Sequence, residues 1–357
     1  MEREALEAAR GSAVRFARQE VAPLLAREGR DGDLTRLPGV LARAEAAGLL
    51  GQGEDAAFAL WGSACEPLAA VVALEAVAEE CAGVALCLHY AAVAQAVFSA
   101  LGDEAEARGA GEGAVGLFAP PALGWPLAKG IRVRATGDEA RVEGELCFVH
   151  GPPDAARYAL FADDGFATAV VVRAGAEGLY EGATEEKVGL AALSTRGLRL
   201  EQVLALAVGP SPWPDAAGVL GRIWLGVAAA AVGNAQGALT AATRYASERY
   251  QGGGLIRDHA AVEELLAEAG SRVACARAFL YAAAERCPAG GLRELAQLKL
   301  RATLDAAQAV SDSLQVLGGY GYMEDYRLEK RLRDALALKV LAGRPADLRR
   351  ATLSERT

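Results

Sequence analysis

Hydrophobic residues recur at helical spacing through roughly the first hundred positions of the chain. The run from Leu68 to Leu101 is apolar almost all round, which is typical of helices buried on several sides inside a bundle. Three glutamates interrupt this run, so we interpret it as two buried helices rather than as a membrane-spanning segment. The pattern predicts an N-terminal helical domain over residues 1–103.

A different pattern begins near residue 104. Gly and Pro become frequent there, and short alternating segments joined by turn residues replace the helical spacing. These segments predict strands at 131–136, 140–149, 158–162, 168–172 and 197–205. We therefore expect a small all-β domain, a barrel or a sandwich, over residues 104–212.

Helical spacing returns after a Pro-containing linker at residues 211–215. Long periodic segments follow at 218–249, 258–286, 292–317 and 328–341. Their lengths and short connections predict a four-helix bundle over residues 213–357. The expected fold class is mainly α with a central β domain, in the order helical domain, β-barrel, four-helix bundle.

Composition narrows the function classes. A net charge of −9 argues against general binding to nucleic acid or to an anionic membrane, although a local group of arginines can still hold a small anion. Six cysteines without a CxxC pair, and only three histidines, argue against a structural metal site. The N-terminus alternates charged with small apolar residues and has no apolar leader, so we expect a cytoplasmic protein.

The most informative stretch is Gln315–Arg350. Gly318, Gly319 and Gly321 alternate there with tyrosines, between the end of one helix and the start of a basic one. Glycines let the backbone approach a ligand closely, and exposed backbone N–H groups favour phosphate or ribose oxygens. Considered by itself, the loop is also compatible with an ordinary glycine-rich turn between helices.

The wider pattern resembles the C-terminal signature of acyl-CoA dehydrogenases: a Gln, then GGxGY, then RxxRD. Gln315, the glycine loop with Tyr322, and the Arg333–Asp334 pair fall in register with it. Residues 242–284 are similar to a second stretch of the family, in which an Arg and a Gln contact the pyrophosphate of FAD. Shorter matches cover most of the chain, and the family has the same order of domains.

This resemblance implies FAD as the cofactor and an FAD-dependent oxidoreductase of fatty acid metabolism as the function. It implies cofactor-binding roles for Arg249, Gln251, Gln315, Gly318, Gly319, Phe148 and His150. Arg222 and Tyr322 are the implied substrate contacts, although Arg222 could equally form an ion pair at the edge of the core.

The implied reaction is the α,β-dehydrogenation of an acyl thioester, carried by CoA or by a carrier protein. Electron-transfer flavoprotein or O₂ would accept the electrons. The resemblance implies a homo- or hetero-tetramer, in which the partner is another copy of this chain or a homologous subunit.

The chain departs from the family at the residue that removes the substrate proton. A carboxylate is needed because it accepts the α-proton while a hydride passes to the flavin. The loop that carries this Glu in the family holds Ala342 here. An alternative Glu position, on the first helix of the bundle, holds Gly221 and is followed by Arg222. Neither residue can act as a base.

The flavin-ring side of the cofactor site also departs from the family. The motif ALTEPxAGSD has become GLFAPPALGWP at residues 116–126, with most of its polar groups replaced. Phe148 can still stack on a flavin ring, and His150 replaces a hydroxyl. His150 is interpreted either as a structural histidine or as a substitute acid or base near flavin N5.

Three functions remain open from the sequence. One is a dehydrogenase with an unrecognised base, for which His150, Glu324 and Asp325 are candidates. Another is a non-catalytic subunit that completes the FAD site of a homologous chain, because the residues for the adenosine-diphosphate half are kept while those for the ring are eroded. The third is a flavin monooxygenase of the same fold, which needs no α-proton base.

Overall fold

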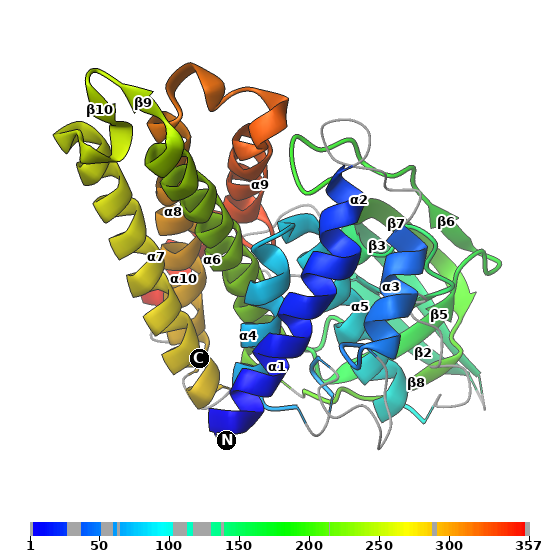
Figure 1. Cartoon of the computed structure of the whole chain (residues 1–357). Helices are drawn as coiled ribbons and strands as arrows, with labels where there is room; N and C mark the ends of the chain where they lie inside the picture. Colours follow the sequence, from blue (N-terminus) through cyan, green and yellow to red (C-terminus); the bar gives the residue numbers. More distant parts are fainter. Residues whose placement is uncertain are drawn as a thin grey trace.

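The described part of the chain contains helices, then a β region, then helices again (Figure 1). This computed structural model describes residues 3–26, 37–50, 60–62, 65–102, 113–116, 130–136, 139–213, 215–287 and 291–353. The expected fold class, with N-terminal helices, a central β region and a C-terminal helical domain, is confirmed. The expected boundary at residues 103–104 lies outside the described residues.

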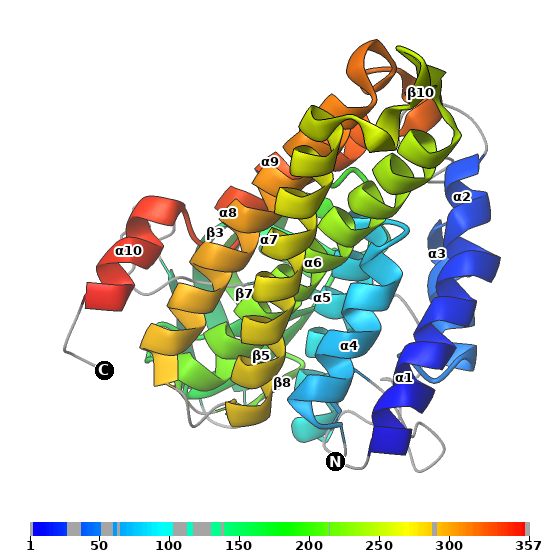
Figure 2. The same cartoon turned by 60° about the vertical axis from the view of Figure 1, so that its left-hand side comes forward.

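The N-terminal helices form an outer and an inner layer. The outer layer consists of α1 (Arg3–Phe16), a π-helical turn (Ala17–Val21), α2 (Ala22–Ala26) and α3 (Leu37–Ala46). The inner layer consists of α4 (Pro67–Ala78) and α5 (Ala82–Ala100). Helix α4 packs between α1 and the first helix of the C-terminal bundle (Figure 2).

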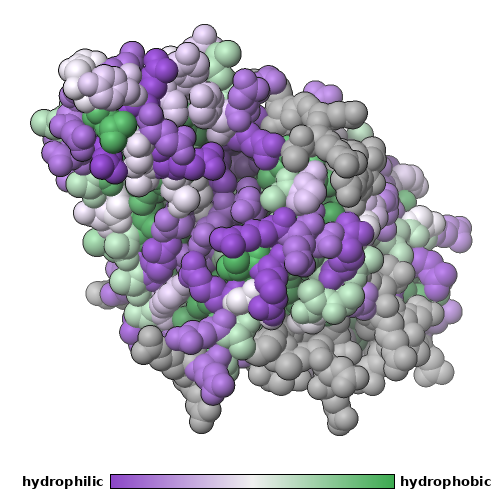
Figure 3. Space-filling view, viewed as in Figure 1, coloured by the Kyte–Doolittle hydropathy of each residue, from purple (hydrophilic) through white to green (hydrophobic). Residues whose placement is uncertain are grey.

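Helices α4 and α5 are buried over nearly their whole length, because almost no position on them carries a polar side chain. In α5 every residue from Ala82 to Phe98 is buried. Helix α5 and the first helix of the C-terminal bundle, α6 (Ala216–Glu248), are long and apolar enough to cross a membrane, yet 94% and 83% of their apolar windows are buried inside the protein. On the face shown in Figure 3, green patches are small and hydrophilic residues prevail. The interpretation of residues 68–101 as two buried core helices is confirmed.

The β region is one sheet built around a long strand, β3 (Glu139–Gly151). One edge of β3 pairs with β7 (Ser194–Leu204), and its other edge pairs first with β2 (Gly130–Thr136) and then with β1 (Gly113–Gly116). Two irregularities in the β3–β7 register bend this strand. The sheet continues through β4 (Arg157–Phe161), β5 (Thr168–Arg173) and β8 (Ala207–Pro210), and β6 (Leu179–Glu181) pairs with β7.

The C-terminal helices run alongside one another (Figure 2). They are α6 (Ala216–Glu248), α7 (Ala260–Arg286), α8 (Gly291–Val316) and α9 (Leu328–Val340). The short α10 (Pro345–Leu353) stands to the side of them and packs on α8. Asp215 caps α6, because its carboxylate accepts the backbone N–H of Gly218 at 2.6 Å. Helix α6 packs on α4 as well as on α7, α8 and α9, so it joins the two helical regions.

Buried carboxylates link the N-terminal helices and the β region to the C-terminal helices through hydrogen bonds. Glu75 on α4 is fully buried and accepts from Arg277 Nε at 2.6 Å and from the Tyr281 hydroxyl at 2.8 Å, both on α7. Asp334 on α9 is buried and accepts the backbone N–H of Leu190 at 2.6 Å, next to the β region. The relative placement of the helices therefore depends on a few hydrogen-bonded carboxylates as well as on apolar packing.

Candidate functional site

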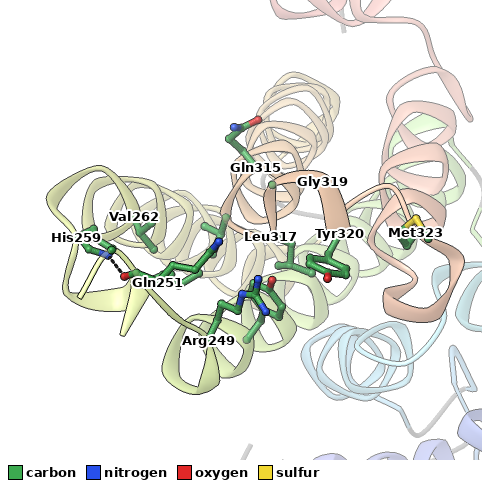
Figure 4. Close-up of a pocket in the computed structure, with 14 residues that line it drawn as sticks. Arg249, Gln251, His259, Val262, Gln315, Leu317, Gly319, Tyr320 and Met323 are labelled. Atoms are coloured by element: carbon green, nitrogen blue, oxygen red, sulfur yellow. Dashed lines mark hydrogen bonds between the residues drawn. The ribbon is translucent and has the colours of Figure 1, made fainter. Parts of the chain in front are cut away.

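A pocket of about 630 Å³ opens at one end of the C-terminal bundle (Figure 4). It lies where the end of α6 meets a small hairpin, the start of α7, and the glycine-rich turn after α8. Its lining residues are Tyr245, Arg249, Gln251, Gly252, Ile256, His259, Val262, Gln315, Val316, Leu317, Gly318, Gly319, Tyr320 and Met323. Segments more than sixty residues apart in the sequence thus meet around one hollow.

The hairpin that forms one wall has a two-residue turn. Strands β9 (Tyr250–Gln251) and β10 (Gly254–Leu255) pair antiparallel, joined by Gly252 and Gly253 with φ of 60° and 91°. A turn with positive φ at both central residues matches the strand twist and favours glycine. Gly252 therefore has a backbone role in this turn. His259 Nε2 lies 3.0 Å from the Gln251 carbonyl oxygen and supports the hairpin.

The opposite wall is the turn that follows α8. A 3₁₀ segment, Gly318–Tyr320, continues the helix, and Gly321 lies so close to Leu314 that a Cβ there would come within 2.4 Å of its carbonyl oxygen. Only glycine fits that approach. At Gly318 and Gly319, in contrast, an added Cβ would meet no atom within 4 Å. The backbone at these two glycines faces open space and can receive a ligand.

Arg249 supplies the positive charge of the pocket. Its Nε is buried without a hydrogen-bond partner, and its Cζ lies 5.5 Å from the centre of the Tyr320 ring. None of the lining residues is acidic. An unpartnered guanidinium beside an open glycine backbone fits a diphosphate, because charge-assisted N–H bonds to phosphate are strong. The residues present therefore fit the diphosphate of FAD.

The five residues predicted for that half of the cofactor all line this pocket: Arg249, Gln251, Gln315, Gly318 and Gly319. In Figure 4, Arg249 and Tyr320 lie close together at one side of the pocket, whereas the amide of Gln315 is directed away from them. Tyr322, predicted to contact substrate, is 70% exposed and stands outside this lining.

His150 lies in a different part of the molecule, on β3. It is buried, its Nδ1 is 3.0 Å from the Thr195 hydroxyl, and its ring lies 5.0 Å from that of Tyr90 on α5. Burial, helped by the positive charge of Lys187, lowers the pKa of His150 to about 3. The imidazole is therefore neutral at pH 7 and a weak base. Phe148, predicted to stack on the flavin ring, is 51% exposed.

The two positions where the family carries a catalytic Glu are held by close packing. Ala342 is buried with φ of 53°, and its carbonyl oxygen accepts from Trp224 Nε1 at 2.7 Å. At Gly221 a Cβ would come within 2.7 Å of Leu295 Cδ1, so a longer side chain would displace the core. Arg222 donates to the Gly218 carbonyl oxygen at 3.0 Å.

Arg222 also stacks over the Trp213 ring at 4.7 Å, and burial lowers the pKa of its guanidinium. An ion pair at the edge of the core was one alternative for Arg222. Among the described residues, the contacts found for this side chain are the Trp213 ring and the Gly218 carbonyl oxygen. The segment 117–126, whose polar groups were predicted to be lost, lies outside the described residues. In the part of the chain that the structure describes, no three His, Cys, Asp or Glu side chains gather to hold a metal ion.

Lys299, fully buried on α8, holds the turn that contains Ala342. Its Nζ donates to the carbonyl oxygens of Gly343 at 2.6 Å and of Lys339 at 2.9 Å. Desolvation by burial lowers the pKa of Lys299 to about 7. A neutral amine keeps two N–H donors, one for each of these carbonyl groups.

We therefore expect stability to rise with pH above neutrality. The unfolded chain keeps the Lys299 proton up to about pH 10.5, whereas the folded chain releases it near pH 7, so the unfolded state binds more protons in this window. Between pH 7 and pH 9 the free energy of unfolding should rise by about 2 kcal/mol more in the unmodified chain than in Lys299→Met. Urea denaturation measures both proteins, and parallel pH profiles would contradict this prediction.

Several pocket residues were not predicted from the sequence. Tyr245 precedes Arg249, the C-cap residue of α6, by one helical turn, and the Arg249 backbone N–H donates to the Tyr245 carbonyl oxygen. The spacing of four residues could therefore have placed Tyr245 beside Arg249. Tyr320 stands inside the glycine loop itself. His259, the N-cap residue of α7, reaches the pocket only because the hairpin folds back, and helical spacing carries no signal for that.

Comparisons with known proteins agree with this architecture. The family described as "Acyl-CoA dehydrogenase, C-terminal domain" matches residues 213–356. The acryloyl-CoA reductase (NADH) of Anaerotignum propionicum is 32% identical over 219 residues, which cover 58% of this chain and 56% of that protein. The short-chain-specific acyl-CoA dehydrogenase of Clostridium acetobutylicum is 28% identical over 304 residues, covering 79% and 80%.

The chain thus spans little more than half the length of the first of these relatives. Among solved structures, a glutaryl-CoA dehydrogenase of Mycobacterium smegmatis in complex with FADH2 aligns with a TM-score of 0.81 at 16% identity. This alignment covers 99% of the present chain and 94% of that one, so the likeness in fold extends over the whole length of the chain.

Proposed function

Because this chain belongs to the acyl-CoA dehydrogenase family of FAD-dependent oxidoreductases, we propose that it serves in the α,β-dehydrogenation of an acyl thioester. Its part is that of a subunit which completes the FAD site of a homologous partner chain. The observation that carries this proposal is the pairing of an intact anion pocket at Arg249 with the absence of a carboxylate at Ala342 and Gly221.

The division of labour follows from the chemistry. FAD, when bound, supplies the hydride acceptor. Arg249 and the backbone at Gly318–Gly319 would hold its diphosphate, while the partner chain would supply the base that removes the α-proton. CoA or a carrier protein would present the thioester, and electron-transfer flavoprotein or O₂ would accept the electrons. The reaction would take place in the cytoplasm.

The alternative is a chain that dehydrogenates its substrate unaided, with His150 as the base. Its neutral imidazole favours this function, because an unprotonated nitrogen is required to accept a proton. The burial of His150 against Tyr90 and its low pKa argue against a role as the base, because an imidazole with a pKa near 3 has a low affinity for a proton. We therefore favour the subunit function.

Absorbance spectroscopy separates these functions. The chain is purified alone and after co-expression with a homologous chain that carries the catalytic Glu. We expect the lone chain to be nearly colourless and inactive, and the pair to be yellow and to bleach anaerobically on addition of an acyl-CoA. Stoichiometric flavin that bleaches with acyl-CoA in the lone chain would overturn the subunit function. Flavin that bleaches only with NADH, followed by oxygen uptake, would indicate a monooxygenase instead.

A further inference from the structure

We propose that Tyr320 is a positioning residue, whose ring holds the Arg249 guanidinium in place over the diphosphate pocket. This inference rests on the proposed function, since it concerns the same pocket. The Arg249 Cζ lies 5.5 Å from the centre of the Tyr320 ring, within the range of a cation–π contact (Figure 4). Arg249 has no carboxylate partner in the ion pairs found among the described residues.

The missing carboxylate is the reason that a ring is needed. A long arginine side chain loses rotamer freedom when it is fixed, so some contact has to orient it before the ligand arrives. A carboxylate would orient it strongly but would also neutralise it and compete with the phosphate for its N–H groups. The face of an aromatic ring attracts the guanidinium and leaves its N–H groups free in the plane. The unpartnered, buried Arg249 Nε fits this arrangement.

The Tyr320 ring is itself held by two other rings. Its centre lies 5.8 Å from that of Tyr326, in a T-shaped contact, and 6.3 Å from that of Tyr245. Tyr245 and Tyr326 also meet, at 5.6 Å and an interplanar angle of 88°. Each of the three rings therefore contacts the other two, in geometries that aromatic pairs favour. Because Tyr245 is on α6 and Tyr326 follows the glycine turn, this cluster also ties α6 to that turn.

Calorimetric titration of the full chain with ADP tests the inference. Tyr320→Leu should weaken ADP binding roughly three- to fivefold, the range of one partly exposed cation–π contact. Tyr320→Phe should bind like the unmodified chain, since the ring and not the hydroxyl makes the contact. In an Arg249→Ala background, Tyr320→Leu should cause no further loss, because the ring acts only through the arginine. A merely structural role would not produce this loss of effect.

Tyr180→Leu is the matched control, because the Tyr180 ring is 49% exposed, lies 4.4 Å from the Cζ of another arginine, Arg199, and stands outside the pocket lining. It should leave ADP affinity unchanged. If Tyr320→Leu weakens binding equally with and without Arg249, or not at all, the positioning role is wrong while the pocket stands. If Arg249→Ala leaves ADP affinity unchanged, or the unmodified chain does not bind ADP, the pocket assignment fails, and with it the proposed function.

Discussion

Replacing Arg249 with alanine should weaken the binding of ADP roughly 10- to 100-fold. Arg249 is the one Lys or Arg side chain among the residues that line the pocket, and its Nε is buried without a partner. Hydrogen bonds to charged groups contribute about 1.5–3 kcal/mol, and about 1.4 kcal/mol corresponds to a tenfold change in affinity. Titration calorimetry at constant ionic strength measures the change, because phosphate contacts depend on salt.

Arg257→Ala is the control for this prediction. Arg257 is close by in the sequence, on the short 3₁₀ segment before α7, but it pairs with Asp258 and its side chain is 52% exposed. Removing it changes the net charge by the same amount without touching the pocket lining. Equal losses of affinity in both variants would mean that ADP responds to the overall charge of this end of the bundle and not to a site built around Arg249.

The second large effect is on stability. Asp334→Ala should lower the free energy of unfolding by about 3–5 kcal/mol, as expected when one partner of a buried ion pair is removed. Asp334 is 1% exposed, and its two oxygens accept from Leu190 N–H at 2.6 Å and from Lys330 Nζ at 2.7 Å. The variant leaves a buried backbone N–H without this acceptor and deprives a buried lysine of this carboxylate. Urea denaturation gives the difference.

Asp305→Ala provides the comparison on the same bundle. Asp305 pairs with Arg301 one helical turn away, and the Arg301 side chain is 59% exposed. An exposed pair of this spacing contributes only about 0.5 kcal/mol. If Asp334→Ala lowers the free energy of unfolding no more than Asp305→Ala does, the buried carboxylate does not stabilise the contact between α9 and the β region. Asp334→Asn, which keeps an acceptor for Leu190, should fall between the two.

The contacts of Asp334 give a structural role to the segment that resembles RxxRD of the family signature. The contact of Asp334 with Leu190 joins α9 to the segment before β7. Arg331, near it, donates from Nη2 to the Glu79 carbonyl oxygen at 2.6 Å and so reaches the N-terminal helices. The two parts of the signature thus have different roles. The glycine-rich turn lines the pocket, whereas α9 forms hydrogen bonds to the β region and to the N-terminal helices.

Long elements could be predicted from the sequence because their apolar spacing is repeated over many turns. The segment expected to be helical at 258–286 is α7, which begins two residues later, after a short 3₁₀ segment. The helix α10 (Pro345–Leu353) was not predicted, because only two of its apolar residues, Leu348 and Ala351, are buried and so short a segment shows no clear period. The β9–β10 hairpin was also missed, since each strand has only two residues.

The site was harder to predict than the fold. Arg249 and Gln315 are far apart in the sequence, and their placement around one pocket was expected from family resemblance, not from periodicity. The contact of Tyr320 with Arg249 depends on the path of the turn, which follows from the close approach of Gly321 to Leu314. The state of His150 could not be predicted either, because its low pKa results from burial by residues distant in the chain, such as Tyr90.

A crystal structure of the chain grown with ADP is the most direct test of the central claim, that the pocket at the end of the bundle holds a dinucleotide diphosphate. We expect phosphate density within hydrogen-bonding distance of the Arg249 guanidinium and of the backbone N–H groups around Gly318–Gly319. Nucleotide bound elsewhere, with the Arg249 side chain turned to solvent and the glycine turn bare, would contradict it.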